Sequence, residues 1–463
     1  MLVTTSSLEN YCVIDPSTGD ALESYSNHSA AEIDKALEAS TLAFESWKRT
    51  SYGARAELLN KVASKLREEK SVLAGAMAIE MGKPIGIGEA EAEKCAFVLE
   101  YYAENGESFL QSYTAEAGFR ESYVTYRPLG PIFGIMPWNF PLWQVFRACA
   151  PILMAGNTFV LKHAPRVPRT ALAIERIFLE AGFPAGVVRN VFADNQQAAD
   201  IIASPAIKGV CLTGSERAGS AVASTAGRHL KKVLLELGGS DPYIVLEDAD
   251  LDLAANKTAT SRMLNNGQTC ISAKRFIVVD AVADAFADKM IAELKAYKMG
   301  HPTEEGVNQG PVSREDLRRQ LSDQVDRSVE AGAGVLLGGK PHDGDGFFYP
   351  ATLLDEVGVD SPAFNEELFG PVGSIIRVRD EKEAIQLSNA TSLGLGGAVF
   401  TQDIDRGKRI AEEEIEVGTC VVNDFVRSDP RLPFGGINRS GFGRELGAEG
   451  IREFVNIKTV CVG

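Results

Sequence analysis

The chain has 463 residues, of which 45% are hydrophobic and 24% charged, a composition typical of folded globular proteins. This length exceeds what one hydrophobic core ordinarily organises, so two or three packed units are expected. The formal net charge of -16 argues against nucleic acid or an anionic membrane as a partner, because both require clustered lysine and arginine. An anionic substrate would have to be attracted by local cations.

No segment has the pattern of a signal peptide or the roughly 18 apolar residues of a membrane helix, so a cytoplasmic location is expected. The seven cysteines are scattered, odd in number and without CxxC spacing, and the five histidines are dispersed. The sequence therefore predicts neither a disulfide framework nor a metal site. It leaves room for a single reactive thiol.

The N-terminal part is predicted to be mainly helical. Alanine-rich segments with apolar residues at three- and four-residue intervals indicate helices over residues 29–67, 71–81 and 89–110. A short alternating strand over residues 123–127 follows.

From residue 131 the pattern changes to short apolar runs that alternate with helices, as in a parallel sheet buried on both faces. The predicted strands span residues 132–136, 158–161, 187–192 and 209–212. The predicted helices span residues 142–154, 169–181, 195–203 and 216–227. This order predicts a doubly wound α/β unit, whose ligands bind beyond the carboxyl ends of the strands.

A second alternating series starts near Val233 and runs to about Phe425, which predicts a second α/β domain. Its predicted strands span residues 243–246, 275–279, 373–378 and 397–400. The tail over residues 451–462 reads as a strand with no obvious partner nearby. An unpaired strand invites addition to the sheet of another subunit.

The most informative segment for chemistry is N-N-G-Q-T-C, which ends at Cys270. A thiol in such a polar loop is accessible, but a free cysteine with a pKa of about 8.5 is only a few per cent thiolate near neutrality. A nucleophile here therefore needs nearby dipoles or a base. Taken alone, the segment would more often hold a buried structural cysteine.

A glutamate between apolar residues, Glu236, precedes two glycines in the segment L-E-L-G-G. Partial burial would raise the pKa of its carboxyl towards neutrality, which suits a general base that activates water. The alternative is a strand-end carboxylate paired with Lys231 or Lys232.

A third segment, M-P-W-N-F-P, contains Asn139 between two prolines at the end of an apolar strand. A rigidly held asparagine amide there could donate a hydrogen bond to a developing oxyanion. As an isolated motif it could equally be a proline-bounded helix start.

Together these segments resemble the aldehyde dehydrogenase superfamily, in the right order and over nearly the whole chain. The further matching segments are L-T-G-S at 212–215, E-E-L-F-G-P at 366–371, P-F-G-G at 433–436 and S-G-F-G-R-E at 440–445. The resemblance implies an α/β fold of two doubly wound Rossmann-like domains with a small β oligomerisation arm.

The implied division gives residues 1–108 and 128–237 to a cofactor-binding domain and residues 238–437 to a catalytic domain. Residues 109–127 and 438–463 would form the oligomerisation arm and C-terminal strand. A homodimer or homotetramer is expected, since subunits of this family generally pair through such an arm.

The resemblance also implies a mechanism. The thiolate of Cys270 attacks an aldehyde, and the Asn139 amide and the Cys270 backbone N–H hold the oxyanion of the thiohemiacetal. After hydride transfer to a nicotinamide, water deprotonated by Glu236 hydrolyses the thioester, with Glu445 as a proton relay.

The cofactor site implied by the resemblance lacks the GxGxxG fingerprint. Instead Gly214 and Ser215 open a helix that follows a strand, where free N–H groups suit the pyrophosphate, although a bare serine there is ordinarily only an N-cap. Lys162 is implied at the adenosine ribose, Glu367 at the nicotinamide ribose and Phe369 beside the nicotinamide. The other implied cofactor contacts are Met136, Pro137, Trp138, Pro165 and Leu237.

Pro165 is a departure from the family pattern. Many NAD-preferring members carry a glutamate three residues after the lysine, where it binds the ribose hydroxyls. Without that carboxylate a 2′-phosphate is not repelled, so NADP is expected to be accepted alongside NAD or preferred to it.

The substrate is predicted from Arg147 and Ser428, which match positions that hold the substrate carboxylate in succinate semialdehyde dehydrogenases. Phe434 is a further implied contact. An arginine can hold a carboxylate through two parallel hydrogen bonds. The alternative is that Arg147 is a structural cation on a helix.

That match is incomplete, because a second arginine of those enzymes is Leu264 here, and Arg427 or Arg431 is expected to replace it. The chain is most similar to the shorter NAD(P)-dependent branch of succinate semialdehyde dehydrogenases. Oxidation of succinate semialdehyde to succinate is therefore predicted, with glutarate semialdehyde or another small aliphatic aldehyde as the alternative.

Three other functions are disfavoured. A CoA-acylating aldehyde dehydrogenase generally lacks the base that Glu236 supplies. A catalytically silent relative would be expected to have lost Cys270 or Asn139. A plain Rossmann-type alcohol dehydrogenase would need a Tyr-Lys pair or a zinc set, and neither is found.

Overall fold

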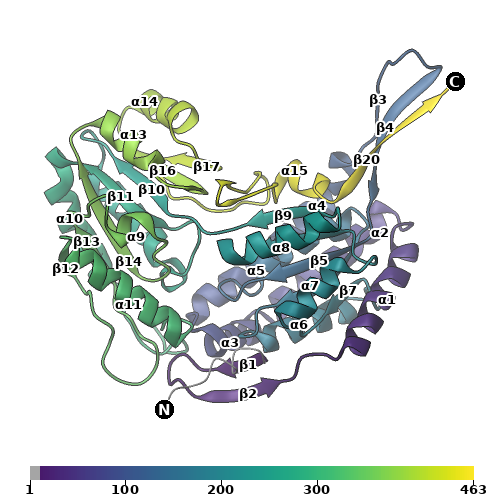
Figure 1. Ribbon diagram of the computed structural model, residues 1–463, viewed down its shortest axis with the longest axis horizontal. Helices are drawn as coiled ribbons and strands as arrows, with labels where there is room; N and C mark the ends of the chain where they lie inside the picture. Colours follow the sequence, from purple (N-terminus) through teal and green to yellow (C-terminus); the bar gives the residue numbers. More distant parts are fainter. Residues whose placement is uncertain (1–10) are drawn as a thin grey trace.

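Two twisted sheets covered by helices and a projecting three-stranded ribbon make up the architecture of the computed structural model, which describes residues 11–463 (Figure 1). The predicted α/β class is confirmed by this arrangement. Residues 1–10, which we assigned to the first domain, lie outside the described part. Among residues 11–463 no helix has both the length and the apolar composition needed to cross a membrane.

Four helices lead the chain after a hairpin of β1 (Tyr11–Ile14) and β2 (Ala21–Tyr25): α1 (Ala30–Trp47), α2 (Tyr52–Glu68), α3 (Lys70–Met81) and α4 (Ile85–Phe109). The single helix predicted over residues 29–67 is wrong, because two helices occupy this stretch. Ser51 ends the gap between them, and its side chain accepts a hydrogen bond from the backbone N–H of Ala54 at 3.2 Å. The apolar period continues across the break, so it could not reveal a serine cap that restarts the helix.

The first large sheet has six strands in the order β19-β9-β8-β5-β6-β7. Its strands are β5 (Pro131–Met136), β6 (Thr158–His163), β7 (Val188–Asn190), β8 (Gly209–Thr213), β9 (Lys232–Glu236) and β19 (Gly441–Phe442). The connecting helices are α5 (Trp143–Met154), α6 (Pro168–Glu180), α7 (Asn195–Ala203) and α8 (Glu216–Arg228). All pairs are parallel except β19 with β9, and the order reverses between β5 and β8, which is where doubly wound sheets bind ligands.

The second large sheet has seven strands in the order β12-β13-β14-β11-β10-β16-β17. Its strands are β10 (Asp241–Val245), β11 (Ala273–Val279), β12 (Gly334–Leu337), β13 (Thr352–Asp355), β14 (Val372–Val378), β16 (Gly396–Phe400) and β17 (Thr419–Val422). Its helices are α9 (Leu251–Met263), α10 (Asp280–Lys295), α11 (Glu315–Glu330), α12 (Pro362–Asn365), α13 (Glu381–Asn389) and α14 (Ile404–Arg409). Val233, where we placed the start of this series, belongs to β9 and therefore to the first sheet.

The projecting ribbon consists of β3 (Tyr113–Thr114), β4 (Glu121–Pro128) and β20 (Val455–Val462), in the order β20-β4-β3. The C-terminal strand, for which the sequence shows no obvious partner nearby, pairs antiparallel with the whole of β4. These strands are more than 300 residues apart in sequence, so no local pattern could connect them. Within residues 438–463, only β20 joins the ribbon; β19 joins the first sheet, and α15 (Gly447–Arg452) packs against α4 and α5.

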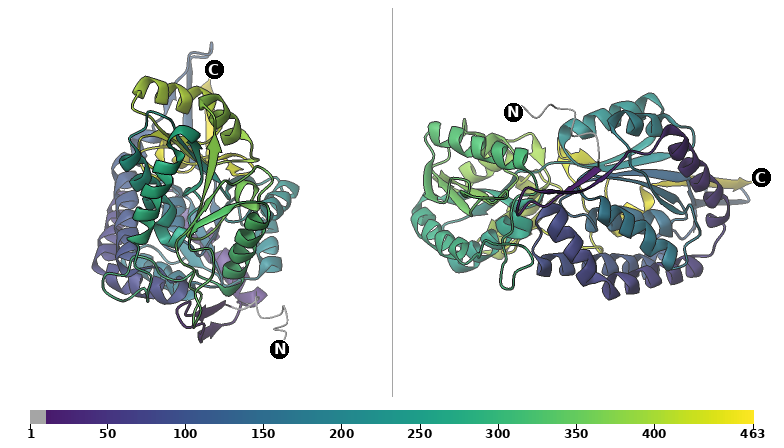
Figure 2. Two further views of the ribbon diagram at one scale, coloured as in Figure 1. Left: turned by 90° about the vertical axis from the view of Figure 1, so that its left-hand side faces the viewer. Right: turned by 90° about the horizontal axis from the view of Figure 1, so that it is seen from below.

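The two lobes lie side by side, and β20 projects away from the lobe of the six-stranded sheet in both views that show it in profile (Figures 1 and 2). The carboxyl end of β9 continues through Gly238 and Gly239 into β10 of the other lobe. The carboxyl edge of the first sheet therefore meets the amino edge of the second.

Candidate active site

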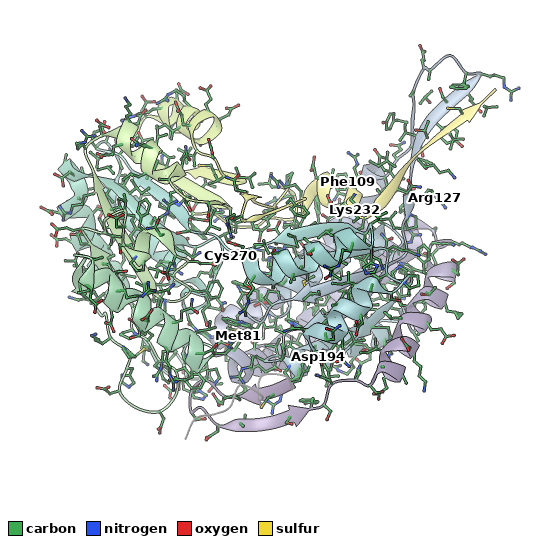
Figure 3. All side chains as sticks on the ribbon, viewed as in Figure 1. Met81, Phe109, Arg127, Asp194, Lys232 and Cys270 are labelled. Carbon is green, nitrogen blue, oxygen red and sulfur yellow. The ribbon has the colours of Figure 1, made fainter. Side chains whose placement is uncertain are left out.

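Cys270 lies where the two lobes meet (Figure 3). A cavity of about 200 Å³ has Cys270 in its wall. This is several times the roughly 30 Å³ that one water molecule occupies in the liquid, so a small organic molecule has room. The cavity draws on α4, α5, the loop before β11 and the loop after β17. Its charged and polar walls include Lys94, Arg147, Arg427 and Ser428.

The loop that carries Cys270 has an unusual backbone. Asn265, Asn266 and Gly267 all have left-handed φ angles, at 56°, 58° and 75°. A β-carbon on Gly267 would lie 2.2 Å from the backbone of Gly370, so this position requires glycine. Asn266 connects the loop to other parts of the fold, because its side-chain amide donates hydrogen bonds to the carbonyl oxygens of Gly82 at 2.9 Å and Pro311 at 3.0 Å.

Two buried cations bind the carbonyl groups of the same loop. Lys274 donates to the carbonyl oxygens of Thr269 at 3.0 Å and Cys270 at 2.6 Å. Arg262 donates to the carbonyl oxygens of Gly267 and Ala273. Sequence reasoning missed both residues, although each is a charge among buried neighbours of the N-N-G-Q-T-C segment.

Cys270 remains partly exposed, but protein atoms crowd its sulfur. Burial raises the pKa of the thiol to about 12, against the opposing positive charges of Arg147 and Lys274. The thiol is therefore protonated at neutral pH in this state, and any nucleophilic role requires a base or a bound ligand that changes its surroundings.

The Asn139 side chain reaches the same loop from the end of β5. Its amide nitrogen donates to the carbonyl oxygen of Gln268 at 3.0 Å, and Asn265 donates to the Asn139 carbonyl at 2.7 Å. Asn139 and Cys270 therefore come together from two different sheets. This is the donor arrangement that an oxyanion formed near the sulfur would need.

Glu236, Glu445 and Arg147 share one buried volume behind Cys270. Arg147 forms an ion pair with Glu445, and its guanidinium carbon lies 4.7 Å from the centroid of the Phe434 ring. Glu236 ends β9, is 2% exposed and has one carboxylate oxygen without a hydrogen-bond partner among the described residues. Burial raises the pKa of its carboxyl well above the usual range, and the nearby Glu445 adds to that effect.

The structure removes the alternative that Glu236 pairs with a neighbouring lysine. Lys231 donates to the carbonyl oxygen of Ser204, and Lys232 lies 3.8 Å from the carboxylate of Glu453. Among residues 11–463 Glu236 forms no ion pair. A buried carboxyl without such a partner is destabilising, and its raised pKa favours a role in proton transfer.

The residues predicted to contact a cofactor are distributed over both lobes. From the first sheet, Met136, Pro137 and Trp138 follow β5, Lys162 lies in β6 with Pro165 just after it, and Gly214 and Ser215 follow β8. Leu237 follows β9 and packs on Gly219 of α8.

From the second lobe, Glu367 and Phe369 reach across to the first. Glu367 accepts a hydrogen bond from the backbone of Gly239 at 3.2 Å and lies 3.4 Å from the ammonium of Lys274. The rings of Phe369 and Trp138 meet edge to face, with centroids 5.8 Å apart. Ser215 is exposed and caps α8, so the amino end of that helix faces solvent.

The predicted substrate residues Arg147, Ser428 and Phe434 all line the cavity. Ser428 accepts hydrogen bonds from the ammonium of Lys94 at 2.9 Å and from the indole N–H of Trp143 at 3.1 Å. Sequence reasoning missed Lys94. Lys94 is half-buried and lies about one helical turn after the buried Glu91 of α4, but the acidic neighbours make this segment look solvent-exposed in the sequence.

Neither arginine proposed for the second cation is buried. Arg427 lines the cavity rim but pairs with Asp424 at 2.9 Å. Arg431 pairs with Asp429 at 2.7 Å and is not in the cavity wall.

Comparisons with known proteins agree with this geometry. The model of the aldehyde dehydrogenase family matches residues 2–460. A succinate-semialdehyde dehydrogenase [NADP(+)] of Mycolicibacterium paratuberculosis is 43% identical over 454 residues, 97% of this chain and 96% of its own. A probable succinate-semialdehyde dehydrogenase [NADP(+)] of Synechocystis is 43% identical over 449 residues, covering 97% of this chain and 99% of that one.

Among solved structures, succinic semialdehyde dehydrogenase from Streptococcus pyogenes in complex with NADP+ superimposes with a TM-score of 0.95 at 37% identity. The match covers 98% of this chain and 99% of that one. The family model spans nearly the whole chain, and the relatives are far above the similarity at which a shared family is secure. The chain belongs to the aldehyde dehydrogenase family.

Proposed function

We propose that this protein oxidises succinate semialdehyde to succinate with NADP as the hydride acceptor. The observation that carries the proposal is the convergence of a partly exposed thiol, an asparagine amide and an unneutralised carboxyl at one cavity whose wall is cationic. In a protein with a net charge of -16, such cations give an anionic aldehyde a local site of attraction. The names of the relatives support the same substrate.

Cys270 is the proposed nucleophile. Its thiol loses its proton to solvent, the thiolate adds to the aldehyde carbon, and the carbonyl oxygen becomes an oxyanion that the Asn139 amide and the Cys270 backbone N–H stabilise. The loss of one such donor typically lowers the rate by roughly 100- to 1000-fold. Loss of hydride from the thiohemiacetal carbon leaves a thioester on Cys270.

Glu236 is the proposed base for the second half of the reaction. It takes a proton from water, the hydroxide adds to the thioester carbon, and the carboxylic acid departs as the C–S bond breaks. Glu445, held by Arg147, lies close enough to influence the pKa of Glu236 and is the proposed relay for its proton.

The chemistry of the predicted cofactor residues fits an NADP molecule. When bound, the oxidised nicotinamide supplies the hydride acceptor. Ser215 at the exposed start of α8 suits the pyrophosphate, and the Trp138–Phe369 pair offers an aromatic wall. Lys162 is buried and its pKa is lowered to about 8 by that burial, so a phosphate beside it would raise that pKa again and stabilise the ammonium. Pro165 brings no carboxylate that would repel a 2′-phosphate.

We assign cofactor binding to the lobe of the six-stranded sheet and the nucleophile to the lobe of the seven-stranded sheet. The presence of two separate sheets supports this assignment of roles. The β3-β4-β20 ribbon is the proposed oligomerisation arm of a homodimer or homotetramer. Ile457 on β20 is 61% exposed and Tyr113 on β3 is 54% exposed, so the ribbon presents apolar side chains that a second subunit could cover.

The substrate and cofactor are tested by steady-state kinetics with succinate semialdehyde, glutarate semialdehyde, butanal and benzaldehyde, each with NADP and NAD. We expect the highest kcat/KM for succinate semialdehyde with NADP. A higher kcat/KM for glutarate semialdehyde would make that aldehyde the proposed substrate instead. A hundredfold preference for NAD would overturn the cofactor assignment.

The chemistry is tested with a Glu236→Gln variant mixed with aldehyde and NADP. We expect one NADPH per active site and an acyl adduct on the Cys270 peptide, detected by mass spectrometry, with slow turnover afterwards. Cys270→Ser serves as the control and is expected to give neither signal. An intact Glu236→Gln enzyme without an adduct would refute the covalent mechanism.

A further inference from the structure

The ammonium of Lys274, in β11, lies against the loop that carries Cys270. The lysine side chain is 1% exposed, and it donates hydrogen bonds to the carbonyl oxygens of Thr269 at 3.0 Å and Cys270 at 2.6 Å. Its third polar neighbour is the carboxylate of Glu367 at 3.4 Å. Burial lowers the pKa of the ammonium, but three acceptors surround its three N–H groups and stabilise the charged form.

The Thr269 carbonyl belongs to the same peptide group as the backbone N–H of Cys270. Among residues 11–463 this N–H makes no hydrogen bond to another backbone group, so it is available to the proposed oxyanion. The carbonyl accepts hydrogen bonds from both Lys274 and the Ser272 hydroxyl, the latter at 2.9 Å. Because hydrogen bonds in a chain polarise one another, a cation on the carbonyl oxygen makes the N–H of the same peptide a stronger donor. It also fixes the direction in which that N–H points.

Arg262 provides a contrast within the same loop. It is another fully buried cation, and it donates to the carbonyl oxygens of Gly267 and Ala273. Neither carbonyl shares a peptide group with the Cys270 N–H. Both cations therefore hold the loop, but only Lys274 acts on the peptide that carries the proposed donor.

Glu367 connects this peptide to the predicted cofactor site. Its carboxylate contacts the Lys274 ammonium and accepts a hydrogen bond from the backbone N–H of Gly239 at 3.2 Å. The positive charge of Lys274 lowers the pKa of the Cys270 thiol, whereas the negative charge of Glu367 raises it. A ligand that binds the Glu367 carboxylate would therefore change the field that Lys274 applies to the loop.

We propose that Lys274 is a positioning residue for the oxyanion site, which orients and polarises the Thr269–Cys270 peptide, and that Glu367 weakens this effect. The proposal rests on the proposed function, because it assumes that Cys270 is the nucleophile and that its N–H is an oxyanion donor. Lys274 acts through the peptide and does not touch the reacting atoms. It supports both halves of the reaction, since an oxyanion forms when the thiolate adds to the aldehyde and again when hydroxide adds to the thioester.

The first test measures the rate at which iodoacetamide alkylates Cys270 in the enzyme without ligands, at one fixed pH below the pKa of the thiol. Under these conditions the rate follows the thiolate fraction. In Lys274→Met we expect the rate to fall roughly 3- to 10-fold, because a charge that favours the thiolate is lost. A purely structural role predicts the opposite sign, since a loosened loop would expose the thiol and speed its alkylation.

Three further variants sharpen this test. Lys274→Arg keeps the charge and is expected to retain most of the wild-type rate. Glu367→Gln is expected to speed alkylation, and to do so less in the Lys274→Met background, where the ammonium that it opposes is absent. Arg262→Met is the matched control, because it removes a buried cation from the same loop; its alkylation is expected not to slow.

The second test measures the NADPH burst at saturating succinate semialdehyde and NADP. For Lys274→Met we expect the burst rate to fall roughly 10- to 100-fold, less than the roughly 100- to 1000-fold typical of losing an oxyanion donor itself. The KM for the semialdehyde is expected to change little, because the cavity lining among residues 11–463 does not include Lys274. If Lys274→Met does not fold, Lys274→Gln carries both tests. It keeps a donor without the charge, and its rates are expected to lie between those of Lys274→Met and the wild type.

Faster alkylation or an unchanged burst rate in folded Lys274→Met would overturn the assignment, and so would an equal slowing of both in Arg262→Met. Failure of the proposed function gives a different result. If Glu236→Gln forms no acyl adduct on Cys270, the covalent mechanism is wrong, and the oxyanion role of Lys274 is wrong with it. If the adduct forms and the Lys274 variants behave as the wild type, only the role of Lys274 is wrong.

Discussion

Two carboxyl groups and one guanidinium occupy the buried volume behind Cys270, and one cation cannot neutralise both acids. Arg147 is committed to Glu445, which leaves Glu236 desolvated beside a second carboxyl. The pKa values of both acids are raised by burial, that of Glu236 to well above its usual range. Burial therefore disfavours the charged form of Glu236, which makes it a stronger proton acceptor, while Arg147 stabilises the charge of its neighbour Glu445.

The Arg147–Glu445 pair gives a stability prediction. Arg147→Met is expected to lower the free energy of unfolding by about 3–5 kcal/mol, because it leaves Glu445 buried without its partner. The double variant Arg147→Met with Glu445→Gln is expected to recover most of that loss. Denaturant unfolding of the two single variants and the double variant measures the coupling, and additive losses would show that the pair contributes nothing beyond its separate residues.

Lys94 gives a pH prediction. Burial and the charge of Arg147 lower the pKa of its ammonium to about 8, while Glu91 and Asp429 oppose that shift. The ammonium is charged below this pKa, so the KM for succinate semialdehyde is expected to rise as the pH increases through about 8. The KM for butanal has no such dependence, and in Lys94→Arg the rise is expected to disappear. Parallel pH profiles for the two aldehydes would contradict the prediction.

At the scale of elements, the loop before β11 is held in place by contacts with residues that lie outside the loop. Three successive left-handed residues turn the chain, and their conformation is maintained by Gly82 after α3, by Pro311, and by Gly370 before β14. Arg262 at the end of α9 and Lys274 in β11 bind its carbonyl groups. The loop is therefore shaped by five parts of the fold before any ligand binds.

Gly267→Ala tests this account. The added methyl group would meet the Gly370 backbone at 2.2 Å in a left-handed conformation, so a loss of about 1–3 kcal/mol in stability is expected, together with slower acylation. Gly75→Ala, in the middle of α3 with no atom within 4 Å of its new methyl group, is the matched control. It is expected to be neutral or slightly stabilising. Thermal unfolding and the NADPH burst measure both effects, and equal behaviour of the two variants would refute the steric argument.

At the scale of the whole molecule, the active site depends on two lobes and the proposed assembly depends on the ribbon. The site lies between the carboxyl edge of one sheet and the amino edge of the other, so neither lobe contains it alone. The ribbon projects beyond the lobe of the six-stranded sheet (Figure 1), and β20 and β3 are its edge strands. An edge strand with exposed apolar residues is stable in water when another surface covers it.

Ile457→Asp tests the proposed oligomer. A buried charge at the centre of an interface is strongly unfavourable, so the variant is expected to shift towards a smaller assembly. Light scattering after size-exclusion chromatography measures the mass. Lys458→Asp, on the neighbouring position of β20, controls for a new acidic residue on the opposite face of the strand. An unchanged mass for Ile457→Asp would show that Ile457 does not lie in the subunit interface.

Local sequence patterns determined the α/β class and most of the helices and strands around the first sheet, because buried parallel strands and amphipathic helices differ in period. The helix over residues 195–203 has the predicted ends, since an aspartate cap precedes it. Motifs also singled out Cys270, Asn139 and Glu236, whose roles remain predictions.

Only the tertiary structure decided which charges have partners. It paired Arg147 with Glu445, left Lys94 in the cavity wall and joined β20 to β4, which the sequence had left without a partner. These contacts join residues tens to hundreds of positions apart, and the energy of a buried charge depends on what surrounds it in space. A sequence shows which residues are charged, but only the folded chain determines which of those charges remain free to bind a ligand.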